Sequence, residues 1–367
     1  MSDLDRIVNV RISKETATLS QKSFGVPLIP FEADETSWDD NWDSVLDEGQ
    51  SKTFSTTGEI LEAFPKGTAG KSVADTDFYK AAQAILAQPT KVKKLQVGRI
   101  IHGSAADLTE NLEGFAHQDS DFYFIVPAFA IPETEAVVGG RYRALPQFAD
   151  ETERILFCSP TNNANLFSNS ANSLAKLWGS FTKCVVMAAQ AGEWNWAAWV
   201  GEGAPFDPGS STWAYKRLAT ITPTKATSGD FSNITREGNW ANIYHDIYGQ
   251  SITEEGKCTS GEWIDVEIGI DWIRIRLQEA IYTKLVQARK IPFDDVGIQI
   301  IHSEVGSILQ DGAKKGIIQG NTIEISSPLF ADIPKALVGK RHLPDINFSA
   351  AVQGAIYATT INGKITL

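Results

Sequence analysis

One short stretch of the chain carries the residue types of a phosphate-binding loop. It reads GTAGKS from Gly67 to Ser72. A P-loop needs another glycine five positions before the glycine of the Gly-Lys pair, where this chain has Pro65, and no apolar strand precedes the stretch. A second pair, Gly201 and Gly203, lacks the third glycine of a dinucleotide-binding turn and is followed by Pro205. We therefore expect a surface loop at the first stretch, a turn at the second, and no cofactor.

Nucleophilic catalysis would have to use one of the five histidines of the chain. They are His102, His117, His245, His302 and His342. No Gly-x-Ser-x-Gly elbow occurs, and Cys184 lies inside an apolar run rather than at a turn between a strand and a helix. We therefore expect ordinary structural or exposed histidines and no enzyme. The alternative is a hydrolase built on an α/β domain, which a nucleophile beside a histidine would reveal.

Two pairs of aspartates have a spacing that could ligate a cation. They are Asp119 with Asp121 and Asp294 with Asp295. Both pairs lie beside expected element boundaries, where aspartate commonly caps helices, so capping is favoured over metal binding. The cysteines are Cys158, Cys184 and Cys258. They have no CxxC spacing, which argues against a metal site, and only Cys258, in a polar segment, leaves an intermolecular disulfide open.

Three tryptophans lie close together in the sequence and could form a platform for a sugar. They are Trp194, Trp196 and Trp199. Aromatic residues are enriched both in protein cores and in subunit contacts. We therefore expect the group to lie in the core or at a subunit contact.

The acidic composition of the chain narrows the classes of partner. Its 367 residues include 33 Lys and Arg against 45 Asp and Glu, which gives a net charge of −12. Binding to nucleic acid would need a basic patch, and the densest basic run is only Lys91, Lys93 and Lys94. The acidic N-terminus lacks the apolar region of a secretory signal, and no apolar stretch approaches the ~20 residues of a membrane helix. We expect no nucleic-acid partner, no membrane insertion, and folding in a cytosol.

The order of the expected elements indicates a chain with more than one domain. Helical stretches separate four apolar runs, which favours a mostly parallel sheet covered on both faces. The runs are residues 95–101, 121–127, 154–159 and 184–189. After an irregular connection at 192–232, Asp271 is expected to cap one long helix, and a second amphipathic helix is expected to stop at Gly312. These two helices and a strand at 323–325 predict a separate α+β unit.

Both ends of the chain have the pattern of exposed β-strands. In Ile7–Ile12, the side chains of Val8, Val10 and Ile12 fall on one face of the pleat. Ala355–Leu367 is also typical of a strand, and neither end has a hairpin partner beside it. Because chain ends usually fray, such ends suggest pairing with something distant, in the same fold or in another chain. Contacts of this kind between subunits build a helix or tube when the rotation does not close, which indicates a structural polymer.

One feature of the last segment leaves a second arrangement open. Asn362 and Gly363 form an Asn-Gly pair flanked by apolar residues, which is a strong signal for a tight hairpin. A hairpin there would leave a shorter donor strand.

Several segments resemble the tail sheath proteins of contractile-tailed bacteriophages. The most specific is Gly238–Ile281, where ANIY, EGK, SGEWIDV and GIDW follow one another at the start of a long helix. The opening RIVNVRISKETATLSQKSFGVPLI, the block SKTFSTTGEILEAFP with DFYKAAQAIL, and the closing GAIYATTINGKITL resemble the same family. The resemblance therefore runs almost end to end.

The resemblance implies a multi-domain α/β plus α+β fold with a strand arm at each terminus. The expected divisions are an N-terminal arm (1–20), the N-terminal part of a conserved core (21–90), a mostly parallel α/β domain (91–235), an α+β core domain (236–343) and a C-terminal arm (344–367). Both arms would be lent to neighbouring subunits. The arm residues expected at subunit contacts are Ile7, Val8, Val10, Ile12, Ile356, Tyr357, Ile361 and Ile365.

The resemblance also implies an assembly and a set of partners. Copies of the chain would stack as hexameric rings in a helical tube around a tail tube protein, with baseplate and tail terminator proteins at its ends. The sheath would assemble in the cytoplasm of a bacterial host, belong to the virion tail, and contract to drive the tube through the host envelope. Another virion part, such as a tube or baseplate protein, is the alternative, although tube proteins are generally smaller and dominated by β-structure.

Overall fold

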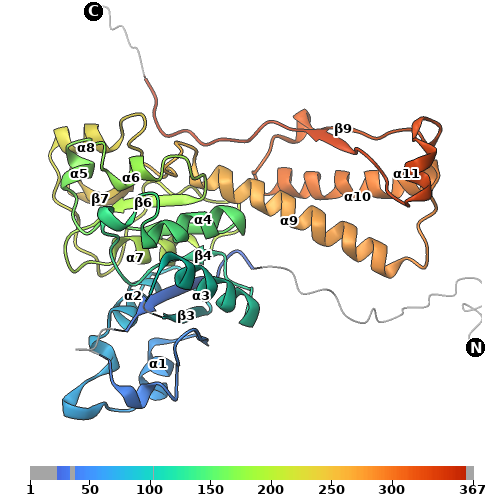
Figure 1. The fold of residues 1–367 in the computed structure, drawn as a ribbon. Helices are drawn as coiled ribbons and strands as arrows, with labels where there is room; N and C mark the ends of the chain where they lie inside the picture. The colour runs from blue at the N-terminus through green and yellow to red at the C-terminus, as the bar shows by residue number, and fades with distance from the viewer. Residues whose placement is uncertain (1–22, 34–37, 102, 361–367) are drawn as a thin grey trace, which may run out of the picture.

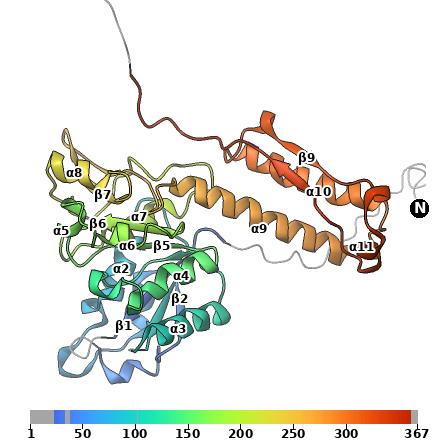
Figure 2. The ribbon, with the colours of Figure 1, turned by 45° about the horizontal axis from the view of Figure 1, so that its top comes forward.

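The chain folds into a body built around a sheet, from which two long helices project (Figure 1). The computed structural model describes residues 23–33, 38–101 and 103–360. The two helices run side by side away from the body, and a small second sheet lies along them (Figures 1 and 2). The mixed α/β fold and the mostly parallel sheet predicted from the sequence are therefore observed.

Among the described residues, one eight-stranded sheet forms the centre of the body. Its strands are β1 (Pro27–Glu32), β2 (Ser51–Phe54), β3 (Leu95–Ile100), β4 (Phe124–Ile125), β5 (Ile155–Cys158), β6 (Cys184–Ala188), β7 (Asn242–Ile247) and β8 (Gln250–Glu254). Their order is β2-β3-β1-β4-β5-β6-β7-β8, and only the edge strands β2 and β8 pair antiparallel with their neighbours. The four predicted apolar runs supply β3 to β6. The expected divisions after residues 90 and 235 both fall between strands of this one sheet.

Strand β1 lies in the middle of the sheet although it contains two prolines, which lack the N–H that a ladder needs. Pro27 is the first residue of the strand, and only Pro27 and Leu28 pair with β4. The carbonyl oxygen of Pro30 accepts a hydrogen bond from the N–H of Ala128 at 2.9 Å, so Pro30 faces the β4 side beyond the end of β4. Because both backbone groups of a residue in a parallel strand face the same neighbour, the missing N–H of Pro30 removes no bond of the β1–β4 ladder.

Side chains of the strands alternate between two hydrophobic cores, one on each face of the sheet. In β5, Ile155 and Phe157 belong to the first core, whereas Leu156 and Cys158 belong to the second. The first core is covered by α1 (Thr57–Ala63), α2 (Asp77–Leu86) and α7 (Asn195–Gly203). The second is covered by α3 (Ala105–Gln118), α4 (Ala144–Glu151), α5 (Ala164–Phe167), α6 (Leu174–Leu177) and α8 (Ser228–Ile234). Burial on both faces explains why these strands are continuous apolar runs.

Helix α7 corrects two expectations from the sequence. It lies within the stretch 192–232, which was expected to be irregular, and its last turn contains Gly201 and Gly203, which were expected to form a turn. A Cβ atom at Gly201 would lie 2.3 Å from the carbonyl oxygen of Ile85 in α2. The glycine is therefore required for close packing of two helices, which its sequence neighbours do not reveal.

The α+β part consists of two long helices and a two-stranded sheet. Its elements are α9 (Ile264–Gln287), α10 (Asp295–Lys314), β9 (Glu324–Ser326), α11 (Lys335–Gly339) and β10 (Asn347–Ser349). Helix α10 is capped as expected, because the Asp294 carboxylate accepts a hydrogen bond from the N–H of Gly297 at 3.0 Å. The predicted start of α9 was wrong, because Trp263 is its N-cap and Asp271 lies buried in the helix interior. Acidic residues in the first turn favour this earlier start.

Candidate subunit interface

The glycine-lysine stretch and the tryptophans have structural roles. Thr68–Gly70 forms a single 3-10 turn, and the Ser72 hydroxyl accepts a hydrogen bond from the N–H of Ala74 at 3.3 Å, which agrees with a loop.

Trp196 and Trp199 are buried, and their indole N–H groups donate to the carbonyl oxygens of Pro127 at 3.0 Å and Trp213 at 2.9 Å. Core packing is therefore confirmed for these two tryptophans.

One histidine lies beside a hydroxyl, which is the arrangement a hydrolase would need. His302 Nδ1 on α10 lies 3.2 Å from Ser327 Oγ. Among the described residues, no carboxylate is bonded to His302, so the third member of a catalytic triad is missing. His245 pairs with Glu254 at 2.7 Å and stacks on Phe231 instead.

The remaining histidines are His117, His342 and His102. His117 lies in the last turn of α3 and His342 is exposed, whereas His102 lies outside the described residues.

The aspartate pairs bond to the protein itself. Asp119 accepts a hydrogen bond from the N–H of Asp121 at 3.0 Å, and Asp121 accepts one from Ser23 at 3.0 Å and pairs with Lys94 at 2.7 Å. Asp295 accepts a hydrogen bond from the N–H of Phe330 at 2.8 Å. In the described part of the chain, no three His, Cys, Asp or Glu side chains are grouped to hold a metal ion.

All three cysteines are buried thiols. The exposed fraction of Cys258 is 0%, so its sulfur cannot reach a neighbouring subunit without a change in the fold.

A buried cluster of charges joins α9 to the sheet. The Lys183 ammonium, just before β6, lies 2.5 Å from Glu267 Oε2 and 2.9 Å from Asp271 Oδ1. Tyr123 donates its hydroxyl hydrogen to Asp271 Oδ2 at 2.6 Å. Burial raises the pKa of Asp271 above its usual range. Burial alone would lower the pKa of Lys183, but the charges of Asp271 and Glu267 outweigh it and the pKa is raised. This cluster fixes the inner half of α9 on the body.

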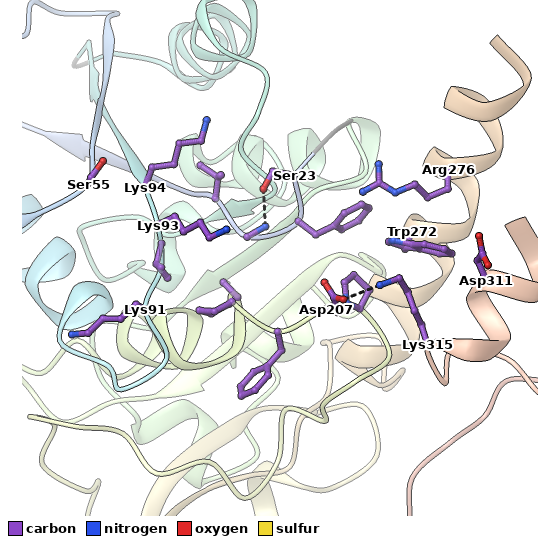
Figure 3. A pocket seen from close by; sticks show the side chains of 18 of the residues that line it. Ser23, Ser55, Lys91, Lys93, Lys94, Asp207, Trp272, Arg276, Asp311 and Lys315 are labelled. Carbon is purple, nitrogen blue, oxygen red and sulfur yellow. Dashed lines mark hydrogen bonds and ion pairs between the residues drawn. The ribbon is translucent and has the colours of Figure 1, made fainter. Parts of the chain in front are cut away.

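A cleft of about 810 Å³ lies between the body and the two long helices (Figure 3). Lysines from the body and Arg276 from α9 line it. Lys315, at the end of α10, donates to Asp207 at 2.8 Å, and its ammonium lies 5.7 Å from the ring centroid of Trp272. Lys94 is likewise paired with Asp121. Carboxylates from the same chain already pair with these two lysines. We therefore assign the cleft to the contact between the body and the two long helices rather than to a ligand.

Helix α9 borders, from Ile270 to Leu285, a groove of about 910 Å³ with an apolar lining. Its walls are side chains of α9 and of the segment around β10: Ile270, Ile273, Arg274, Leu277, Gln278, Ile281, Tyr282, Leu285, Ile318, Phe348, Ser349, Ala350 and Val352. The exposed fractions are 57% for Tyr282, 55% for Leu285 and 45% for Phe348. A helix that carries apolar side chains on more than one face normally has packing partners on each of them. This contiguous apolar surface therefore has the character of a contact site.

The small sheet beside the groove is short and exposed. Strands β9 and β10 pair antiparallel over three residue pairs, Asn347 with Ser326, Phe348 with Ile325 and Ser349 with Glu324. Beyond these three pairs, an isolated antiparallel bridge joins Ile318 to Val352. Two-stranded sheets are marginally stable alone, and their edges can accept further strands. Among the described residues, the C-terminal part of the fold thus combines strand edges that have no further strand beside them with an apolar groove.

The described part of the expected C-terminal arm has two sections. Residues 347–353 pair with residues 317–326 of the same chain, so the strand partner of β9 comes earlier than the expected end strand at 355–367. Residues 354–360 form no strand and run past the start of α9 (Figure 1). Ile356 and Tyr357 lie in this second section. The remaining expected arm residues, Ile7, Val8, Val10, Ile12, Ile361 and Ile365, lie outside the described residues, as does the Asn362-Gly363 pair.

The fold of this chain is similar to that of sheath proteins from contractile systems. A chain of the helical sheath of the anti-feeding prophage in the contracted state is similar with a TM-score of 0.66 and 10% sequence identity, over 98% of both chains. A chain of the sheath complex of the PVC extracellular contractile injection system in the contracted state gives a TM-score of 0.67 and 9% identity over 97% of both chains. A sheath tail protein from Listeria innocua gives 0.50 and 10% identity over 84% of this chain and 89% of that chain.

The likeness lies in structure rather than in sequence. No protein-family model matches the chain, and no curated protein matches its sequence. The resemblance inferred from the sequence motifs is confirmed at the level of the fold. Within the described residues, no helix has the length and apolar character needed to cross a membrane.

Proposed function

We propose that this chain is the structural subunit of a contractile sheath. The fold supports this proposal because the likeness to sheath chains extends over nearly the whole length of both proteins. The observation that carries it comes from the described residues: no further strand of theirs pairs with the β9–β10 sheet, which lies beside an apolar groove, and the same chain has an exposed C-terminal segment. An acceptor and a donor in one subunit are the two halves of a repeating contact.

Exchange of strands between neighbouring subunits would use this donor and this acceptor. The arms that contain Ile7–Ile12 and residues 358–367 would each add a strand to the β9–β10 sheet of a neighbour, with their apolar side chains in the groove along α9. Backbone hydrogen bonds give such a contact its affinity, and alternate side chains give it its register. Because donor and acceptor lie on different surfaces, the contact is heterologous and propagates from subunit to subunit.

The assembled form would be a helical tube of stacked hexameric rings around a tail tube protein. Baseplate and terminator proteins would bound it, in a phage virion tail or a related injection machine assembled in a bacterial cytoplasm. Contraction would rotate and repack the bodies as rigid units, while the exchanged strands keep neighbours connected. The extended form would be metastable and held by its tube contacts until triggered.

Electron microscopy of the purified full-length protein tests the proposal. We expect rings or tubes whose abundance rises with protein concentration, because each added subunit forms the same contact. A strict monomer at all concentrations would overturn the proposed function, and turnover of an ester or peptide substrate by the His302–Ser327 pair would favour a hydrolase instead.

A charge placed in the groove is expected to weaken assembly without unfolding the protein. Leu285→Asp puts a carboxylate where an apolar side chain of the neighbour's arm would lie, and burying it there without a partner costs several kcal/mol. We expect the critical concentration for tube formation to rise by at least about tenfold, as measured by sedimentation.

The matched control is Val286→Asp, on the same turn of α9. Val286 is 62% exposed and does not line the groove. We expect it to assemble like the native chain and both variants to keep the native urea midpoint. Equal effects of the two substitutions on assembly would contradict a role for the groove.

A further inference from the structure

The exposed C-terminal segment is attached to the body at one residue. Ile356 is 89% exposed, but the neighbouring Tyr357 is partly buried. The Tyr357 ring stacks on the ring of Trp263, with centroids 4.6 Å apart and planes at 6°. The Tyr215 hydroxyl donates a hydrogen bond to the Tyr357 carbonyl oxygen at 2.9 Å. Side chain and backbone of Tyr357 are therefore both held by residues distant in the sequence.

Tyr215 and Trp263 together form the site that holds Tyr357, which we call the Tyr357 seat. Trp263 is the N-cap of α9, and the Lys257 ammonium lies 4.7 Å from its ring centroid, a favourable cation–π distance. Tyr215 has a φ of 60°, a left-handed conformation that is uncommon for an aromatic residue. Its backbone is fixed by a 2.7 Å hydrogen bond from its N–H to the carbonyl oxygen of Thr253. Strained conformations of this kind persist where the surroundings enforce them, often at functional sites.

We propose that the Tyr357 seat fixes the point at which the C-terminal arm leaves its own subunit, so that the donated strand begins after Tyr357. This inference rests on the proposed strand exchange and deepens it. Without the seat, the flexible part of the arm would begin after residue 353, where pairing with the chain's own residues ends. Attachment at Tyr357 shortens the free segment and directs it, which raises its effective concentration at the neighbour's acceptor.

The test alters the seat and leaves the arm unchanged. Tyr215→Asn removes the ring and the hydroxyl from the seat, and asparagine tolerates the positive φ of this position. We expect the critical concentration for tube formation to rise roughly three- to tenfold, because an aromatic contact of this kind is lost from the assembly-competent form. Tyr357→Ala is expected to show the same rise, and Tyr357→Phe, which keeps the stacked ring, is expected to behave like the native chain.

A second measurement reports on the seat without any assembly. All three native cysteines are buried, so Ala358→Cys provides a single accessible thiol for a nitroxide spin label. In monomers, we expect the spectral lines to narrow when Tyr215→Asn is added, because the labelled segment gains mobility. Unchanged lines would overturn the attachment itself. Narrowed lines with unchanged assembly would overturn its role in strand donation, and absence of tubes from the native chain would refute the proposed function while leaving the attachment measurable.

Discussion

A chain that ends at Tyr357 is expected to fold normally and to form no tubes. It keeps the whole body, the β9–β10 sheet and the Tyr357 seat, but it has lost the proposed C-terminal donor strand. A missing donor removes several backbone hydrogen bonds at every contact of this kind, so the loss should be complete rather than partial. Negative-stain microscopy and sedimentation at concentrations where the full-length chain assembles would check this, with urea unfolding to confirm a native body.

A longer deletion provides the matched comparison. A chain that lacks residues 344–367 has also lost β10 and Phe348, and with them part of the acceptor. Mixed with full-length protein, the chain ending at Tyr357 should still accept a neighbour's arm and terminate growth, whereas the shorter chain should terminate growth less strongly because part of its acceptor is missing. Normal tubes from the chain ending at Tyr357 would show that the residues after it are not needed for assembly.

Removal of the buried ammonium at Lys183 is expected to cause a large loss of stability. Lys183→Met leaves Glu267 and Asp271 without their counter-charge in the interior, and breaking a buried ion pair from one side typically costs ~3–5 kcal/mol. We expect a fall of that size in the free energy of unfolding, measured by urea denaturation. The fall should be smaller at acidic pH, where the buried carboxyl of Asp271 is protonated and needs no counter-charge. Because burial raises the pKa of Asp271, this contribution to the stability of the protein is lost as the pH rises through the titration range of the carboxyl.

An exposed ion pair on the same helix is the control for this experiment. Lys284 pairs with Glu304 at 3.0 Å, and its side chain is 42% exposed. Lys284→Met should change the free energy of unfolding by less than about 1 kcal/mol, because exposed pairs contribute little. Equal losses for the two variants would contradict the assignment of Lys183 to the attachment of α9.

Sequence patterns predicted the elements whose surroundings are uniform. The apolar runs at β3, β5 and β6 are buried on both faces, so nearly every residue in them reports the same environment. The N-cap role of Asp294 was also predictable, because capping depends on residues three positions away. These features are local, or they average over many residues of one kind.

Features that depend on distant partners could not be predicted. Asp271 was expected to cap a helix because aspartate is a preferred N-cap residue. Its actual partners, Lys183 and Tyr123, are 88 and 148 residues away. Likewise, no pattern around Tyr215 or Tyr357 indicated that their side chains meet across 142 residues. The apolar groove was missed for the same reason, since its walls come from α9 and from the segment around β10.

Helix α9 would carry a small rotation of the body into a large displacement at its far end. All its buried residues lie between Ile264 and Ile275, whereas its remaining turns extend away from the body (Figure 1). Its 24 residues span roughly 36 Å, so a rotation of the body by about 15° would carry the far end through roughly 9 Å. That displacement is about twice the spacing between paired strands, more than a hydrogen-bonded ladder can stretch. The movement would therefore have to be absorbed by bending in the short connection just beyond Tyr357.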